Sequence, residues 1–320
     1  MSEKKKILKI LIHPLIPFFI IFAVLPYIPV IGKYTSLWIE VMIWVIFAIS
    51  FNILLGYTGL PSFGQGAFFG IGAYGAAISF LRLVEGVWTP LGIGVLVATA
   101  AAAFVGLFVC RKRGIYFALI TIAFSQMFFF IAFRWDEVTG GETGLSGIDR
   151  VSVGIPKLFS IDLTPLINYY YFVFVFLVIC ILLIWRIVHS PFGRVLRAIK
   201  ENEVRAKYVG YNTSLYKWAA FVISGMFAGL AGGLYTFLIN AAFSFVLHWT
   251  QSGDVVIMSV LGGGLVNFFG PAVGAVIFII LRDILSAYWR HWLLAYGLIF
   301  ALVVLFIRGG ILGIFSKRRR

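Results

Sequence analysis

The chain has 320 residues, of which 62% are hydrophobic and only 12% are charged, and its formal net charge is +14. Soluble globular domains are about half apolar and about a quarter charged, so this composition excludes that class. The mean hydropathy of +1.03 indicates a polytopic membrane protein. The basic excess does not favour nucleic-acid binding, because no basic surface with groove-reading elements is visible in the sequence.

Ten segments come close to the roughly 20 apolar residues that a membrane-spanning helix needs. They cover residues 10–31, 36–56, 66–82, 88–109, 114–133, 166–187, 217–239, 252–269, 271–288 and 291–308. The last three are short and closely spaced, so their boundaries are the least defined. The sequence therefore predicts an all-α polytopic membrane protein with about ten transmembrane helices, in which residues 1–320 form a single transmembrane domain.

Lysine and arginine are concentrated in alternate loops, which is the pattern of cytoplasmic segments. The basic segments are residues 4–9, 111–113, 186–217 and 308–320, whereas the long loop at residues 134–165 is rich in Asp and Glu. We therefore predict that both termini and the 186–217 loop are cytoplasmic and that the 134–165 loop is extracytoplasmic. The two halves on either side of the cytoplasmic loop are compatible with an inverted repeat of helices, although their residues show no clear similarity.

A short amphipathic helix is predicted within the cytoplasmic loop. Ser190 is a good N-cap, and Pro191 suits the first helical position. Apolar side chains then follow the i, i+3, i+4, i+7 spacing of one helical face, and charged side chains fall on the other. The apolar set is Phe192, Val195, Leu196 and Ile199, and the charged set is Arg194, Arg197, Lys200 and Glu201. Such a helix either lies on anionic lipid headgroups or docks on a soluble partner.

Glycine is concentrated in three clusters, at residues 56–75, 225–233 and 262–274. Small residues at these spacings let transmembrane helices approach closely, which is one interpretation. The Gly, Pro and Ser residues of the first cluster also favour a broken or re-entrant helix, which is tolerated where it is buried or lines a cavity. Glycine-interrupted segments of this kind are a sequence indication of a transporter's central site, so both interpretations are kept for the first cluster.

The sequence contains no catalytic or metal-binding pattern. A phosphate-binding Gly-x-x-x-x-Gly-Lys-Ser/Thr motif is absent, and the four histidines are isolated. Cys110 and Cys180 lie inside apolar runs and are interpreted as small buried hydrophobic residues. We therefore expect no enzyme activity and no metal site in this chain.

A few ionisable residues lie within the predicted spans, where a charge costs about 2.5–3.5 kcal/mol at the middle of a helix. Glu40 lies one turn into the second span, Asp254 begins the eighth, and Arg282 and Asp283 lie in the ninth. Adjacent residues on a helix point apart, so Arg282 and Asp283 do not pair. We predict an intramembrane ion pair between Arg282 and Asp254.

Four motifs together resemble a known family. They are the runs Gly56–Tyr74, Thr139–Ile148 and Phe192–Glu203, and the pair Val260–Gly264 with Phe269–Pro271. In this order and spacing, and over nearly the whole chain, they are similar to the LivM-type permease subunit of branched-chain amino acid ABC importers. The resemblance implies a permease that translocates branched-chain or related hydrophobic amino acids across the plasma (inner) membrane. It implies as partners the lipid bilayer, a second related permease subunit, two cytoplasmic ATPase subunits that use ATP, and an extracytoplasmic solute-binding protein.

By the same resemblance, residues 186–217 are the coupling loop that contacts an ATPase subunit. The predicted contact residues are Phe192, Gly193, Arg194, Leu196, Arg197, Lys200, Glu201, Glu203, Ala206 and Gly210. Ala206 and Gly210 match the Ala-x-x-x-Gly part of the importer motif. The chain departs from the fuller motif, which has Glu-Ala-Ala, because Val204 and Arg205 follow Glu203.

The first glycine cluster is predicted to line the translocation pathway. The predicted residues are Gly59, Ser62, Phe63, Gly64, Gln65, Gly66, Phe68 and Tyr74. Exposed N–H groups around residues 64–67, at the start of a helix, are expected to receive the substrate carboxylate. These residues do not distinguish branched-chain amino acids from urea, amides or aromatic acids. An ATP-independent secondary transporter is a more distant alternative, which the lack of a buried carboxylate relay disfavours.

Overall fold

The computed structural model describes residues 15–27, 32–84, 86–151, 153–155, 159–263, 267–306 and 310–312. Within these ranges the chain is mainly α-helical. The α-helices are α2 (Leu15–Val24), α3 (Thr35–Asn52), α4 (Gln65–Arg82), α5 (Trp88–Val109), α6 (Gly114–Arg134), α7 (Asp136–Thr139), α8 (Leu166–His189), α9 (Pro191–Tyr208), α10 (Thr213–Ile239), α11 (Trp249–Gly262), α12 (Gly270–Tyr288) and α13 (Trp292–Phe306). Three short 3-10 helices, η1 (Leu25–Tyr27), η2 (Gly32–Tyr34) and η4 (Ser244–Leu247), and a π-helical segment, η3 (Ile53–Thr58), complete the helical elements.

Six helices in the described part of the chain are long and apolar enough to cross a membrane. They are Thr35–Thr58, Trp88–Val109, Gly114–Arg134, Leu166–His189, Thr213–Ile239 and Gly270–Tyr288. These helices confirm an all-α polytopic membrane protein. The predicted number of ten crossings stays a prediction, as does the inverted repeat, and the two termini lie outside the described residues.

Helix α10 is at the centre of the bundle, where it packs on α3, α4 and α5. The packing is close because glycines face backbone on the neighbouring helix. A Cβ atom at Gly232 would overlap the carbonyl oxygen of Phe69, and one at Gly72 would overlap the backbone of Gly229. Between α11 and α12, Gly262 and Gly274 play the same part. The second and third glycine clusters therefore serve close helix packing.

The first glycine cluster contains the predicted break. Helix α3 continues as the π-helical η3 to Thr58, and residues 59–64 are not helical before α4 begins at Gln65. The break re-enters the bundle, because the Phe63 N–H donates to Thr121 Oγ1 at 3.0 Å, two turns into α6. A second non-helical stretch follows α10, and Ser125 Oγ of α6 donates to the Leu247 carbonyl at 2.9 Å. Both breaks therefore approach the same part of α6.

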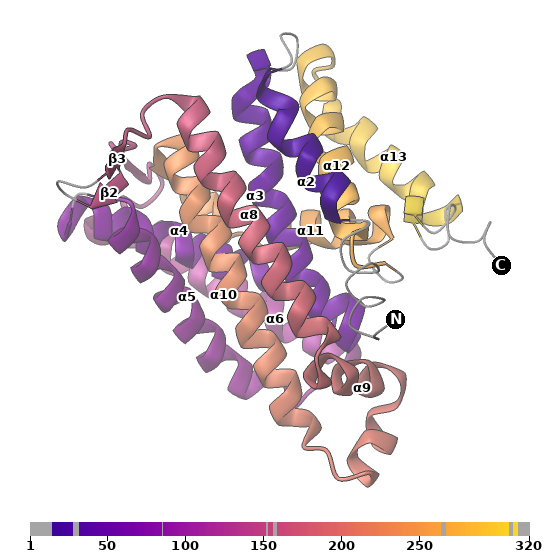
Figure 1. Ribbon diagram of the computed structural model, residues 1–320. Helices are drawn as coiled ribbons and strands as arrows, with labels where there is room; N and C mark the ends of the chain where they lie inside the picture. Colours follow the sequence, from indigo (N-terminus) through magenta and orange to yellow (C-terminus); the bar gives the residue numbers. More distant parts are fainter. Residues whose placement is uncertain are drawn as a thin grey trace.

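The two ends of the bundle differ in structure. At one end, β1 (Leu145–Ser146) pairs with β4 (Ala241–Ala242), and β2 (Val153–Ile155) pairs with β3 (Phe159–Ile161), both antiparallel. Figure 1 shows β2 and β3 at the opposite end of the bundle from α9, which lies beyond the ends of α8 and α10. The predicted extracytoplasmic and cytoplasmic loops are therefore at opposite ends.

The predicted intramembrane pair is wrong in its acidic partner. Arg282 Nη2 of α12 donates to Glu40 Oε1 of α3 at 2.5 Å, and no ion pair joins Arg282 to Asp254 among the described residues. Asp254 was the expected partner because α11, which contains it, directly precedes α12 in the sequence. Arg282 reaches Glu40 because α12 packs on α3 as well as on α11. The sequence does not reveal this long-range contact.

Candidate functional site

Helix α9 is the main element of the candidate site. It begins directly after α8, with Ser190 in an extended conformation as the N-cap and Pro191 in the first turn, as predicted. The Ser190 hydroxyl donates back to the Ile187 carbonyl at 2.6 Å and does not cap the helix. Asn202 is not helical, with φ of −158° and ψ of 97°, so α9 consists of two segments. The Asn202 side-chain oxygen accepts from the Arg205 N–H at 2.9 Å, which caps the second segment.

The apolar face of the first segment turns toward the protein. Leu196 is fully buried, and Val195 and Ile199 are buried with Ala206 in a small cluster of their own. Phe192 stacks on Tyr216 of α10, with ring centroids 5.6 Å apart. The predicted amphipathic stripe is therefore confirmed, and it seats α9 on the chain itself. This arrangement does not fit a helix that lies with its apolar face on lipid.

Two of the predicted contact residues bind the chain's own backbone. Arg197 Nη2 donates to the Val188 carbonyl at 2.9 Å, and its guanidinium lies 5.5 Å from the centre of the Tyr57 ring. Lys200 Nζ donates to the Gly56 carbonyl at 2.7 Å. Because Gly56 and Tyr57 belong to η3, these two side chains attach α9 to the end of α3, just before the break.

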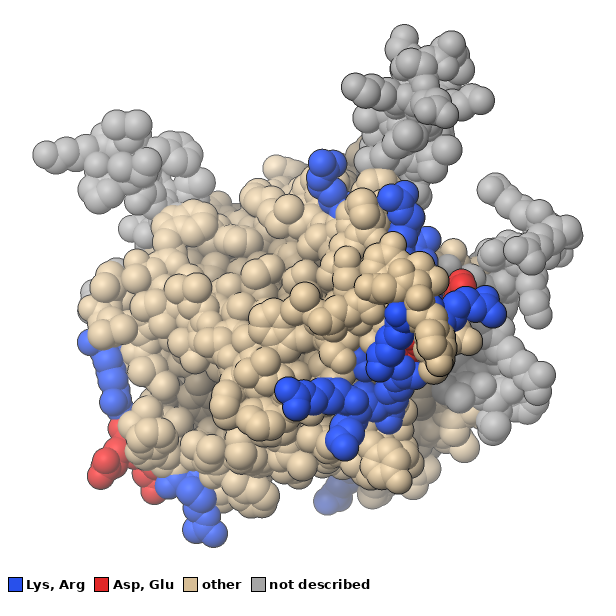
Figure 2. All heavy atoms as spheres, turned by 90° about the horizontal axis from the view of Figure 1, so that it is seen from below, with Lys and Arg blue, Asp and Glu red and all other residues tan. Residues whose placement is uncertain are grey.

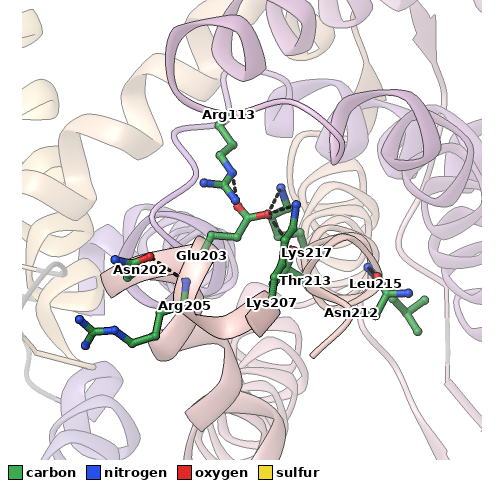
Figure 3. Close-up of polar contacts among 9 residues, drawn as sticks. All are labelled: Arg113, Asn202, Glu203, Arg205, Lys207, Asn212, Thr213, Leu215 and Lys217. Atoms are coloured by element: carbon green, nitrogen blue, oxygen red, sulfur yellow. Dashed lines mark hydrogen bonds and ion pairs between the residues drawn. The ribbon is translucent and has the colours of Figure 1, made fainter. Parts of the chain in front are cut away.

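Glu203 is the most heavily bonded residue of α9 (Figure 3). Its side chain is only 6% exposed, and it accepts from Thr213 Oγ1 at 2.8 Å. Lys217 Nζ, which is almost completely buried, lies 3.2 Å from Glu203 Oε1, and Arg113 Nε forms a close ion pair with Glu203 Oε2. We call Arg113, Glu203, Thr213 and Lys217 the anchor cluster. It joins α9 to the α5–α6 turn and to the first turns of α10.

The anchor cluster holds Glu203 in its charged form. Burial alone would raise the pKa of this carboxyl. The hydroxyl of Thr213 and the cations Arg113 and Lys217 outweigh that effect, so the pKa lies below the ordinary value for glutamate. A buried carboxylate with this many donors has no free position for a partner protein. Glu203 is therefore an internal anchor and not an exposed contact residue.

The opposite side of α9 faces away from the bundle and is exposed. Arg194, Glu201 and Arg205 are exposed, and the last turn presents Val204, Tyr208 and Val209. Tyr208 is 88% exposed and Val209 is 70% exposed, although both are large apolar side chains at the polar end of the bundle. Sequence analysis missed this apolar group, which we call the α9 tip. The available signal was the pair Tyr208-Val209, which interrupts the charged run just before Gly210.

Basic side chains are concentrated at the same end of the molecule (Figure 2). Figure 2 shows the bundle from the α9 side, and blue Lys and Arg side chains gather over the region of α9 with few red Asp or Glu side chains among them. Gly210, which has a φ of +99°, ends this region in a left-handed turn that favours glycine. The exposed face of α9 therefore combines cations with an apolar tip.

The predicted pathway residues lie in different surroundings, and their role in transport stays a prediction. Gly59 lies against Lys200 of α9, and Ser62 and Gln65 are fully buried. Phe68 packs edge-on against Phe221 of α10, with ring centroids 5.3 Å apart. Tyr74 borders a different space, an apolar cavity of about 410 Å³ among α4, α5 and α6.

The N–H groups at the start of α4 are not exposed, contrary to the prediction. The Gly66 N–H donates to Ser252 Oγ of α11 at 2.7 Å. The Gly64 N–H approaches Ser62 Oγ at 3.3 Å, and the Ala67 N–H donates to the Gly64 carbonyl at 3.1 Å. The prediction failed because the sequence does not reveal that α11 begins beside α4. The Gly66–Ser252 bond joins the first turns of two helices that both start inside the bundle.

No group of three or more His, Cys, Asp or Glu residues in the described part of the chain is arranged to hold a metal ion. The two cysteines are buried and unpaired. What the fold and the site define is a polytopic membrane protein whose helix bundle carries an anchored helix with an exposed outer face at one end.

The chain belongs to the family described as "Branched-chain amino acid transport system / permease component", whose model matches residues 34–308. The high-affinity branched-chain amino acid transport system permease protein LivM of Salmonella typhimurium is 28% identical over 293 residues, covering 85% of this chain and 68% of the relative. A probable branched-chain amino acid transport permease protein LivH of Methanocaldococcus jannaschii is 24% identical over 279 residues, covering 82% of this chain and 84% of the relative. The nucleoside ABC transporter permease protein NupC of Lactococcus lactis is 34% identical over 71 residues, or 22% of each chain. No solved structure matches the chain.

Proposed function

We propose that this chain is a permease subunit of an ATP-driven importer for branched-chain or related hydrophobic amino acids in the plasma (inner) membrane. The names of the LivM relatives and the family description support this cargo. The match to a relative named LivH supports assembly with a second, related permease. Two cytoplasmic ATPase subunits and an extracytoplasmic solute-binding protein complete the proposed assembly, in which the ATPase subunits use the ATP.

The observation that carries the proposal is the division of α9 into two faces. Its inward face is attached to three parts of the bundle, through Lys200, Arg197 and the anchor cluster. Its outward face leaves the α9 tip in water, where exposed apolar side chains are unfavourable unless a partner covers them. A helix that is fixed on one side and uncovered on the other suits the transmission of movement from a docked ATPase subunit.

The proposed coupling follows from these attachments. Closure of the ATPase subunits on ATP moves α9, which pulls on the end of α3 through Lys200 and on α10 through Glu203. Because Gly56 lies just before the break and Gly59 is its first residue, the movement reaches the start of α4 directly. Opening requires that the partner contacts the two states differently, since equal contact shifts no equilibrium.

The Gly66–Ser252 hydrogen bond is proposed to close the translocation pathway by holding the first turns of α4 and α11 together. When α4 and α11 separate, the Gly66 N–H becomes free at the positive end of a helix, where it can receive a substrate carboxylate. Ser252→Ala tests this step, because it removes the acceptor without adding bulk. We expect faster uptake or a leak with the assembly intact, whereas Gly66→Leu should block uptake. Unchanged transport by both variants would contradict this pathway.

A different cargo is the nearer alternative, since similar permeases carry urea, amides or aromatic acids, and one short match here is named a nucleoside permease. An ATP-independent secondary transporter is the more distant alternative. Reconstitution of the purified assembly into vesicles, with labelled leucine and an excess of each competing solute, separates these possibilities. Leucine uptake that requires ATP and resists competition by urea and nucleosides supports the proposal.

Co-purification tests the assembly itself. The chain is purified from its native membrane in mild detergent, as the parent and as the Tyr208→Asp variant, and Arg134→Gln at the opposite end serves as the control. We expect an ATPase subunit and a second permease with the parent and the control, and loss of the ATPase subunit with Tyr208→Asp. Recovery of the chain alone, with uptake intact, would overturn the proposal in favour of an independent carrier.

A further inference from the structure

A groove of about 330 Å³ lies between the end of α5 and the start of α10, beside the anchor cluster. The side chains and backbone of eight residues line it: Gly106, Leu107, Cys110, Arg111, Asn212, Ser214, Leu215 and Trp218. None of the ten predicted contact residues and none of the predicted pathway residues is among them, although Asn212, Ser214 and Leu215 lie at the end of the 186–217 loop. The groove is therefore next to the anchor cluster but does not include the outward face of α9.

The walls of the groove are apolar and are formed by two candidate membrane-spanning helices, α5 and α10. Leu107 is 57% exposed and Leu215 is 56% exposed, on two helices that are long enough to span the bilayer. The Trp218 indole lies against Gly106 and donates its N–H to the Ala103 carbonyl at 2.9 Å, so its polar atom is satisfied. Gly106 is needed here because a Cβ atom would approach the indole within 2.9 Å. The result is a flat apolar wall with no unpaired donor.

The mouth of the groove is polar and positive. Arg111 is exposed at the end of α5, with Lys112 and Arg113 directly after it. Asn212 and Ser214 lie at the N-terminus of α10, a helix of 27 residues whose positive end points at the same place. The lining residues include no acidic side chain. The negative C-terminal end of α5 lies at the same place and offsets the end of α10, so the attraction for an anion comes mainly from Arg111 and the adjacent Lys112.

We propose that this groove binds an anionic phospholipid of the cytoplasmic leaflet. The phosphate lies at Arg111 and the start of α10, and an acyl chain lies along Leu107, Leu215 and Trp218. A soluble phosphate would leave the apolar walls uncovered, and a zwitterionic lipid would bring its own cationic group next to Arg111, Lys112 and Arg113, so charge and shape together select an anionic lipid. The groove is at the end of the bundle where α9 lies, which is the predicted cytoplasmic end.

The bound lipid would act on the anchor cluster. Arg111 is two residues from Arg113, and Asn212 precedes Thr213, so one phosphate contacts both chain segments that hold Glu203. Binding therefore holds the α5–α6 turn and the start of α10 in the positions that the anchor cluster requires. We expect anionic lipid to raise the thermal stability of the purified assembly.

Native mass spectrometry of the detergent-purified assembly tests the proposal by titration with palmitoyl-oleoyl-phosphatidylglycerol or the matching phosphatidylcholine. We expect preferential retention of phosphatidylglycerol by the parent. Arg111→Gln should lower that retention about five-fold, since one basic residue near the surface contributes about this factor. Arg111→Lys should restore most of the retention. Arg134→Gln, which removes an exposed arginine at the opposite end, is the matched control and should retain lipid as the parent does.

A second variant keeps the test decisive if Arg111→Gln fails to assemble. Ser214→Phe fills the groove and leaves every arginine in place, so it should abolish retention of phosphatidylglycerol. Equal retention of the two lipids by the parent would overturn the proposal, as would unchanged retention by Arg111→Gln or Ser214→Phe. Inorganic phosphate added in excess distinguishes the source of the anion, because displacement of the lipid by phosphate alone would also overturn it. These readouts need no transport and no ATP, and they can be made on this chain with whatever subunits accompany it, so they stand or fall independently of the proposed function.

Discussion

The described part of the protein contains two groups of paired charges, the anchor cluster at the α9 end of the bundle and the Glu40–Arg282 pair between α3 and α12. The two groups differ in the number of segments that they join. The anchor cluster surrounds one buried carboxylate, Glu203, with two cations and a hydroxyl from two other segments. The pair of Glu40 and Arg282 joins only two helices, and its side chains are 17% and 27% exposed. In the first case one carboxylate joins three segments of the chain, whereas in the second the two helices also pack directly on each other.

This difference separates two roles for charge in a membrane protein. The anchor cluster fixes the second segment of α9, after Asn202, in which Ala206 is the buried apolar side chain, so the position of this segment depends mainly on polar bonds. The Glu40–Arg282 pair sets the register of α3 against α12 within a packed bundle. Removal of a charge is therefore expected to affect α9 most.

The largest effect is expected from Glu203→Ala. The change leaves Lys217 buried and facing Arg113 without a counter-charge, which costs about 3–5 kcal/mol for a buried pair. Hydrogen exchange across residues 191–217 should accelerate, and ATP-driven uptake should be lost. Glu137→Gln is the matched control, because Glu137 is an exposed carboxylate at the opposite end of the bundle and should change neither. Equal behaviour of the two variants would contradict the anchoring role of Glu203.

The next comparison tests the cause of that loss. If the unpaired Lys217 is responsible, the double variant Glu203→Gln with Lys217→Met should recover part of the stability that Glu203→Gln alone loses. A double-mutant cycle on the unfolding temperature of the purified assembly measures the coupling between the two residues. Additive effects would show that Glu203 and Lys217 do not act on one another.

A smaller effect is expected at the other cluster. Arg282→Gln removes a charge-assisted hydrogen bond of about 1.5–3 kcal/mol, reduced by the partial exposure of both side chains. The expected result is a lower unfolding temperature with the α9 region still protected from hydrogen exchange. Asp283→Asn on the same helix is the control, because Asp283 is exposed. Faster exchange in α9 for Arg282→Gln would show that the two clusters are coupled.

The smallest effect is a dependence on pH. The folded pKa of Glu203 lies below its ordinary value of about 4.3, so folding gains stability above that ordinary value and loses it as the pH falls through the folded pKa. Protection of residues 191–217 should therefore be constant near neutral pH and fall in acid. In Glu203→Gln this acid step should be absent. An identical acid profile in the parent and the variant would assign the step to other groups.

Much of the fold was predictable because local signals decide it. The apolar runs located the spanning helices, and Ser190 and Pro191 located the start of α9, since capping and hydropathy act over a few residues. The anchoring was not predictable, because Arg113 and Lys217 reach Glu203 from segments that only the folded bundle brings together.

The candidate site shows the same limit on each face of α9. Arg197 and Lys200 read as solvent-facing charges by helical periodicity, yet both reach back to carbonyls of the chain. The Gly66 N–H was predicted to be free because Ser252 lies far away in sequence. The exposed tip escaped notice because Tyr208 and Val209 follow the last turn of the predicted stripe, where periodicity no longer decides which side chains are buried.

The central claim is that the outward face of α9 docks on an ATPase subunit. It is tested most directly by a photo-crosslinking amino acid at Tyr208, with the same substitution at Tyr288 as the control. The two tyrosines are 88% and 89% exposed, one at the end of α9 and one at the end of α12. We expect an adduct with a cytoplasmic ATPase subunit from position 208 and none with that subunit from position 288. No ATPase adduct from position 208, or equal adducts from both positions, would contradict the account.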